Sequence, residues 1–101
     1  MSADLVETQE EKSTGLMGVK YVSKPMVFTF KPSTRKFWMK NTFVPLDIVF
    51  CFNSAIVEIV HGKPLDPTHI GPSQAVDMVV EFPSGFCKKH DIKKNDFIVL
   101  I

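Results

Sequence analysis

The stretch that decides the fold is LDIVFCFNSAIVEIV, residues 46–60. Leu46–Phe52 is rich in β-branched and aromatic side chains and carries a single charge, Asp47, so it is predicted to form a strand buried on both faces. The Asn-Ser pair at 53–54 favours a tight reversal of the chain. Residues 55–60 are then the antiparallel partner, which places a β-hairpin at the centre of the chain.

Shorter extended segments flank this hairpin on both sides. Apolar side chains alternate between two faces over residues 26–30, and residues 37–40 resume extended chain after a turn. Residues 78–82 form another apolar strand, and residues 97–101 close the chain in the same way. Between the hairpin and the later strands, residues 62–72 hold three prolines and two glycines, which predicts the longest loop of the domain.

Two short helical pieces complete the expected secondary structure. Thr8 followed three residues later by Glu11 is a capping-box pattern, which predicts a helix over about residues 9–17. Ser84 follows a proline and precedes a basic stretch, so residues 84–90 are predicted to form one helical turn with Ser84 as its cap. The expected fold is mainly β, α+β by strict count. Its expected architecture is a compact antiparallel β-sandwich or partly closed barrel with these two helical pieces.

Length and charge limit the classes of function. The chain has 101 residues, so residues 1–101 are interpreted as a single domain with no separate cofactor domain. Twelve Lys and Arg against eleven Asp and Glu give a net charge of +1, which gives no support to generic nucleic-acid binding. The sequence starts without a secretory pattern and has no apolar run of about 20 residues, so we expect an intracellular protein with no membrane contact.

The polar and aromatic residues gather in residues 37–48, which contain FWMKNT followed by PLDI. These two motifs resemble the hallmark of the family called domain of unknown function 192. Other segments are similar to that family's conserved positions in the same order: EKSTGLM at 11–17, MVFTF at 26–30, VVE at 79–81 and IKKND at 92–96. The resemblance implies a small β-rich fold and brings no agreed activity, and many relatives look exported.

The sequence departs from the family pattern at three positions. Lys12 and Val19 stand where the family usually has arginine, and Asn95 stands where it usually has glycine. Lysine keeps the positive charge at position 12 but lacks the guanidinium group, which binds an anion through two parallel hydrogen bonds. An anion-binding site at this position would therefore be weaker. Asn95 is the milder change because asparagine also reaches positive φ.

The strongest candidates for ligand binding are Trp38, Lys40 and Asn41 in the FWMKNT motif. Trp38 and Lys40 are two residues apart on an extended segment and therefore share a face. One interpretation is a pocket wall that stacks a flat or sugar-like group and donates hydrogen bonds to it. The other is a core tryptophan whose edge is covered by the lysine stem.

Two acidic residues, Asp47 and Glu81, each stand alone inside an apolar strand. A buried carboxylate needs a partner or water, because leaving it unpaired is expensive. As a functional pair they would supply acid and base for hydrolysis, or bind a divalent cation together with Asn41. As structural groups, each would be held by Lys40 or by backbone N–H groups that fix the strand register.

Other reactive side chains give little support for catalysis. Cys51 and Cys87 lack a metal-binding or redox spacing and are expected to be free thiols. The three histidines, His61, His69 and His90, also lack a ligand spacing, so no metal site and no cofactor are predicted. Neither a phosphate-binding loop nor a serine elbow is present in the sequence.

The leading hypothesis is a non-enzymatic accessory domain that binds a small polar ligand or a protein partner through the FWMKNT face, with Trp38, Lys40, Asn41, Asp47 and Glu81 as its site residues. One alternative is a small hydrolase or lyase that uses Asp47 and Glu81. Another is a structural component of a larger complex. The sequence does not decide between enzyme and binding domain, and it does not predict the oligomeric state.

Overall fold

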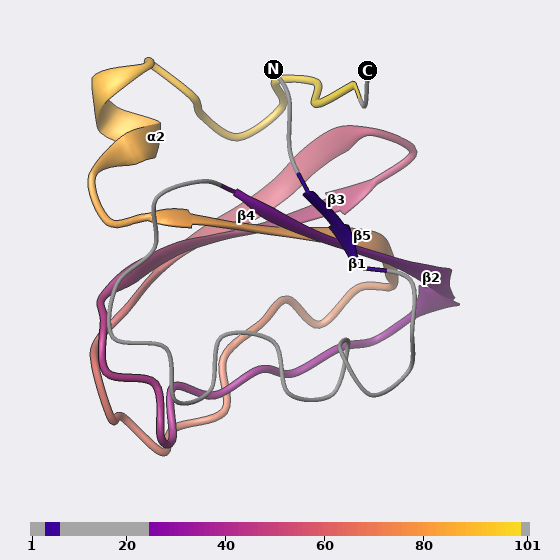
Figure 1. Cartoon of the computed structure of the whole chain (residues 1–101). Coiled ribbons are helices and arrows are strands. Elements are labelled where there is room, and N and C mark those ends of the chain that lie inside the picture. Colours follow the sequence, from indigo (N-terminus) through magenta and orange to yellow (C-terminus); the bar gives the residue numbers. More distant parts are fainter. Residues whose placement is uncertain (1–3, 7–24, 100–101) are drawn as a thin grey trace.

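The computed structural model describes residues 4–6 and 25–99 (Figure 1). The helix expected over residues 9–17 lies outside this part of the chain. A single sheet runs through the described residues in the order β1-β2-β5-β3-β4. The elements are β1 (Asp4–Val6), β2 (Met26–Ser33), β3 (Leu46–Phe52), β4 (Ala55–Gly62), β5 (Val76–Pro83) and the short helix α2 (Phe86–Lys89).

Four of the five strands are antiparallel, which confirms the mainly β class. β2 pairs with β5, β5 with β3, and β3 with β4, while β1 runs parallel to β2. The predicted hairpin is β3–β4, and its turn residues Asn53 and Ser54 have φ angles of 49° and 67°. Positive φ at both central residues is what a tight type I′ turn requires, and asparagine adopts it readily.

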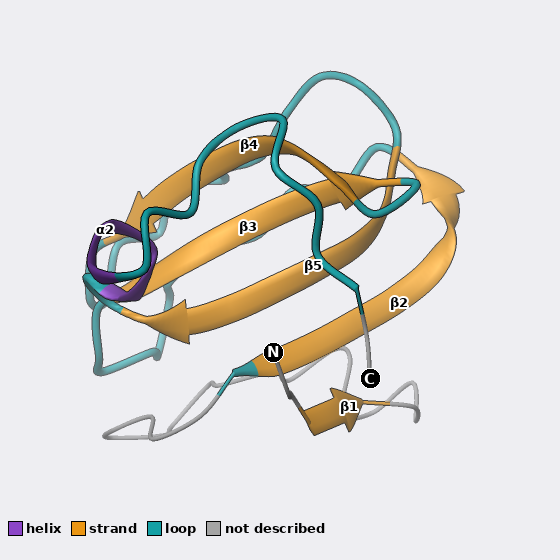
Figure 2. Cartoon of the chain, turned by 90° about the horizontal axis from the view of Figure 1, so that it is seen from above, coloured by secondary structure: helices purple, strands orange, loops and turns teal. Residues whose placement is uncertain are grey.

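Other segments cover both faces of the sheet, although there is no second sheet in the described chain (Figures 1 and 2). The loops 34–45 and 63–75 cover one face, and α2 with the segment after it covers the other. The loop-side core consists of Phe28, Met39, Leu46, Ile48, Phe50, Val76 and Val79. The helix-side core consists of Val27, Val49, Cys51, Ile56, Met78, Val80, Phe82, Cys87 and Ile98.

The central strand β3 contributes to both cores, which explains its unbroken apolar sequence. The architecture is therefore a single open sheet with loop and helix covers, instead of the expected sandwich or partly closed barrel. Loops can replace a second sheet here because their own apolar side chains, such as Met39, fill the space above the strands.

Three local predictions were wrong in detail. In the described part of 97–101, Phe97 makes only an isolated bridge with Ala55, and Phe37 makes only an isolated bridge with Ile70. Buried and exposed residues alternate in these segments because one side of each segment packs on the core. A covering loop produces this pattern as readily as a strand does. The cap of α2 is Gly85, with φ 86° and no side-chain hydrogen bond, so Ser84 is not the cap. The helical turn itself is confirmed.

Candidate functional site

The FWMKNT motif lies in a loop layer that a second loop holds in place. Phe37 and Ile70 exchange two backbone hydrogen bonds of 2.7 Å, and Met39 donates its N–H to the carbonyl of Asp66 at 3.0 Å. Further along, the N–H of Leu65 donates to the carbonyl of Thr42 at 2.9 Å. Backbone pairing at both ends fixes the path of the motif, so its side chains have defined directions.

Inside this layer the side chains alternate between the core and the surface. Met39 is 2% exposed, and the ring of Phe37 packs edge-to-face on Phe28 and Phe50 at centroid distances of 6.2 and 5.7 Å. Trp38 points the other way and is 43% exposed. Gly62 lets Met39 approach the sheet, because a Cβ at that position would lie 2.6 Å from the methionine sulfur.

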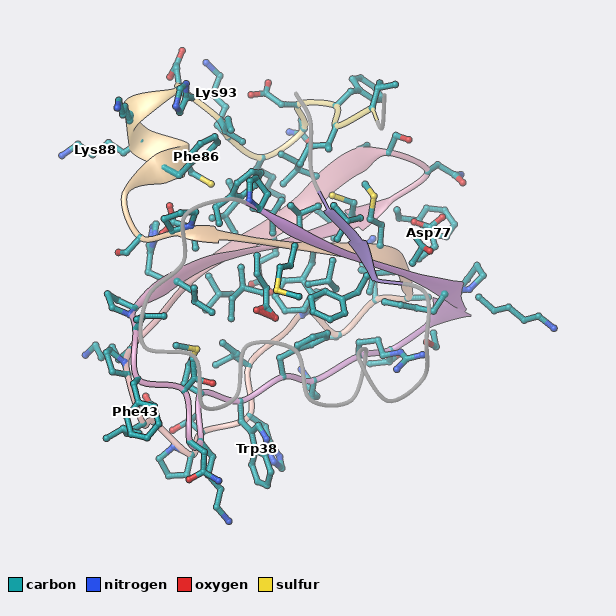
Figure 3. The ribbon with its side chains drawn as sticks, in the orientation of Figure 1. Trp38, Phe43, Asp77, Phe86, Lys88 and Lys93 are labelled. Carbon is teal, nitrogen blue, oxygen red and sulfur yellow. The ribbon has the colours of Figure 1, made fainter. Side chains whose placement is uncertain are left out.

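The exposed tryptophan has a cation and an imidazole as neighbours. Nζ of Lys40 lies 5.2 Å from the centroid of the Trp38 ring, and the His69 ring lies 5.0 Å away. Lys40 and Trp38 therefore share a face as predicted, and the tryptophan is not a core residue. Figure 3 shows Trp38 and Phe43 projecting on the side of the sheet away from Phe86. We define the loop face as six exposed residues of this layer: Trp38, Lys40, Asn41, Phe43, Leu65 and His69.

Asn41 is placed by the turn of the motif. Its φ is 62°, it is exposed, and it lies between Lys40 and the buried Thr42. The N–H of Thr42 donates to the carbonyl of Met39 at 3.0 Å, which closes the turn. The left-handed conformation accounts for asparagine here, since few other side chains adopt it without strain. Its side chain is nevertheless exposed, which places the amide on the loop face.

Glu81 lies on β5 and projects into the loop-side core. It is paired with Ile48 on β3 and with Met26 on β2, and paired residues of antiparallel strands project from the same face. Only 5% of Glu81 is exposed, and this burial raises the pKa of its carboxyl to about 7. Desolvation penalises the charged form, so the neutral acid is favoured over a wider pH range than usual.

Asp47 lies on the opposite face of the sheet. Its register partner is Phe82, which belongs to the helix-side core. The fully buried carboxylate accepts a hydrogen bond from the backbone N–H of Cys87 at 3.0 Å and lies 2.7 Å from Nδ1 of His61. Asp47 thus joins β3 to β4 and to α2.

The structure does not bring the predicted site residues together. Trp38, Lys40 and Asn41 form one group on the loop face, whereas Asp47 and Glu81 project from opposite faces of the sheet. Among the described residues, Asp47 is held by a backbone N–H and a histidine, and Lys40 lies over Trp38. A hydrogen bond from a backbone N–H is one of the two structural roles expected for Asp47 from the sequence.

Sequence reasoning did not identify His61 and Cys87 as the partners of Asp47. Counting back from the turn at 53–54 would place Val60 opposite Asp47 in a regular hairpin. A register shift between Phe50 and Cys51 moves His61 into that position. The irregularity has no clear sequence signal, because every residue around it favours extended chain.

The two cysteines are both in the helix-side core. Burial is the main cause that raises the pKa of each thiol to about 12, and the carboxylate of Asp47 adds to the effect at Cys87. Such thiols are poor nucleophiles at neutral pH. Within residues 4–6 and 25–99, no group of three His, Cys, Asp or Glu side chains is arranged to hold a metal ion. None of the helices in that part is long and apolar enough to cross a membrane.

Comparison with known proteins gives one family and two solved structures. The model of a family described as "Uncharacterized ACR" matches residues 1–100. A protein of unknown function from Novosphingobium aromaticivorans is 29% identical, with a TM-score of 0.86 over 94% of this chain and 71% of that chain. A protein from Sinorhizobium meliloti, described as a candidate transcription regulator, is 26% identical, with a TM-score of 0.88 over 94% of this chain and 78% of that chain. No curated protein matches the chain.

Proposed function

The chain belongs to the family of domain of unknown function 192, and from that premise we propose that it is a non-enzymatic binding domain that uses its loop face. The observation that carries this proposal is the exposed Trp38 on a loop layer fixed by backbone pairing. Tryptophan dominates the energetics of many interfaces, and an exposed apolar cluster is informative where a single exposed residue is not. Phe43 and Leu65 are further exposed apolar residues of the loop face.

The chemistry of the loop face favours a flat group that carries hydrogen-bond acceptors. The indole ring offers a surface for stacking, and the Lys40 ammonium and Asn41 amide supply donors next to it. A free small molecule and a side chain of a protein partner can both present this chemistry. If the chain is a component of a larger complex, a side chain of a protein partner would supply the flat group.

The geometry gives less support to a hydrolase or lyase. Such an enzyme would need Asp47 and Glu81 near one substrate, and the two carboxylates project from opposite faces of the sheet. Asp47 is fully buried and its two oxygens already have partners. A general base must reach the proton that it abstracts, and neither acid is on the surface that carries Trp38.

The binding proposal can be tested by fluorescence because Trp38 is the only tryptophan of the chain. Nucleosides, aromatic acids and saccharides are titrated into the protein, and a saturable change in Trp38 emission is expected for at least one class. Lys40→Ala should weaken that binding, and calorimetry should show its loss in Trp38→Ala. Phe97→Ala is the matched control, because Phe97 is exposed but lies outside the loop face.

A partner protein is tested by a photo-crosslinking amino acid at position 43, with position 97 as the control site. A crosslinked product at position 43 that disappears in Trp38→Ala would identify a partner as the source of the flat group. Binding that persists in both Trp38→Ala and Lys40→Ala would contradict the proposal. So would the absence of saturable binding together with no Trp38-dependent crosslink.

A further inference from the structure

A second surface lies at the free edge of the sheet, on β4. The segment after α2 already pairs with the beginning of this edge. The N–H of Ile56 donates to the carbonyl of Asp96 at 2.8 Å, and the N–H of Asn95 donates back to the carbonyl of Ile56 at 2.9 Å. At Asn95, with φ 76°, the chain turns away. No described residue pairs with the outer edge of β4 beyond Ile56, so this edge is open as far as Gly62.

A groove of about 540 Å³ runs beside the open part of the edge. One wall is β4 itself, and the other is formed by α2 and the turn that follows it. Ile59 and Ile92 contribute apolar surface, and both pack against the helix-side core. The lining residues are Val57, Glu58, Ile59, His61, Cys87, Lys88, Ile92, Lys93 and Lys94.

The charged lining of this groove is mainly cationic. Lys88, Lys93 and Lys94 line it together with the exposed imidazole of His61. Glu58 also lines the groove, but it pairs with Phe50 of the loop-side core and its Oε2 is buried. Lys93 also lies 3.4 Å from Asp91, but both side chains are well exposed and such pairs are weak. Figure 3 shows Lys88 and Lys93 on the α2 side of the sheet, away from Trp38.

The two walls are fixed relative to each other by the buried carboxylate of Asp47. It binds His61 on one wall and the backbone N–H of Cys87 on the other. The rings of Phe82 and Phe86 stack at a centroid distance of 4.5 Å and attach α2 to β5. A binding surface that is already ordered loses less entropy when a ligand arrives.

We infer that this groove binds an extended acidic peptide segment, which adds to β4 as a further strand. The backbone groups of residues 57–62 would pair with the peptide over about 20 Å, at about 3.3 Å per residue. The lysines on the opposite wall would bind carboxylates of alternate residues. A small anion would use the lysines alone and leave the strand edge unused, whereas a peptide uses both features.

The probe for this inference is a fluorescein-labelled peptide of sequence Glu-Val-Glu-Val-Glu-Val, whose binding is followed by anisotropy. The reversal Lys88→Glu together with Lys94→Glu should weaken its binding by about tenfold or more. Lys31→Glu, on β2 and outside the groove, introduces a charge reversal of the same kind and should have at most a small effect. Trp38→Ala should leave the binding unchanged, which separates this site from the loop face.

Two further measurements distinguish strand addition from simple charge attraction. A peptide with proline in place of the valines lacks the backbone N–H groups at those positions. Its binding should therefore fall at least tenfold, although its charge is the same. Amide hydrogen exchange of residues 57–62 should slow when the original peptide is bound. Equal binding of both peptides, full competition by inorganic phosphate, or no binding at millimolar peptide would each overturn the inference.

Discussion

Each face of the sheet buries a carboxylate, Asp47 on one and Glu81 on the other, and the two are accommodated in different ways. On the helix side, Asp47 is paired with His61 and with the backbone N–H of Cys87. On the loop side, burial raises the pKa of Glu81 to about 7. The two residues are one register position apart on neighbouring strands, since Asp47 pairs with Phe82 and Ile48 with Glu81. The comparison shows that one acid fixes an arrangement of elements and the other makes stability depend on pH.

The largest expected effect concerns Glu81 and pH. Its pKa is raised from 4.5 to about 7 on folding, so the unfolded chain loses this proton at lower pH than the folded chain does. The stability associated with neutral Glu81 is therefore present below pH 4.5 and lost as the pH rises to about 7. A difference of this size corresponds to about 3 kcal/mol.

Glu81→Gln should remove this dependence. Denaturant melts at pH 5 and pH 8 should show a smaller loss of unfolding free energy with rising pH in the variant than in the original protein. At pH 8 the variant should be the more stable of the two. An identical pH profile in both proteins would show that the fold accommodates charged Glu81 without penalty.

The next effect concerns Asp47, whose neutralisation should act in the opposite direction. Asp47→Asn replaces one acceptor oxygen by an NH₂ group, which cannot accept a hydrogen bond from His61 or from Cys87. Leaving a buried donor poorly satisfied should lower the unfolding free energy by roughly 1–3 kcal/mol at neutral pH. Urea melts measure this change, and Asp91→Asn, at an exposed position, is the control. A more stable Asp47→Asn protein would contradict the structural role of this residue.

The smallest effect is on the cysteines, and it sharpens the same comparison. With thiol pKa values of about 12, both should react slowly with iodoacetamide at pH 8. Asp47 contributes to the raised pKa of Cys87, whereas Asp77 does so for Cys51. Asp47→Asn should therefore accelerate alkylation of Cys87 more than that of Cys51, as measured by mass spectrometry of the two peptides. Equal acceleration would mean that the substitution only loosens the whole fold.

The features that were predicted correctly from the sequence are determined by residues that are close together in the chain. The β3–β4 hairpin follows from a run of strand-forming residues interrupted only by Asp47, and from an Asn-Ser turn. The helical turn of α2 was also expected, although its cap is Gly85 and not Ser84. Asn95 has φ 76°, in agreement with the expectation that asparagine can replace the family's glycine there. In each case the physical cause is local backbone preference.

The features that could not be predicted depend on register and on the path of the covering loops. Alternation along Leu46–Phe52 shows that Asp47 and Ile48 face opposite sides, but it does not say which side Glu81 shares. That depends on how β5 aligns with β3, and a shift of one residue would exchange the faces. Likewise, the pattern at 37–40 fits a strand or a loop, and only the loop layer leaves Trp38 exposed.

The sheet order also determines when the domain can assemble. β5 pairs with both β2 and β3, although it follows all the other described strands in the chain. During synthesis the β3–β4 hairpin can form early, but β2 and β3 have no strand between them until residue 83 has emerged. Until then an apolar edge of β3 is open to other chains, and such edges promote aggregation. The insertion of β5 is therefore both the long-range step that slows folding and the step that ends this exposure.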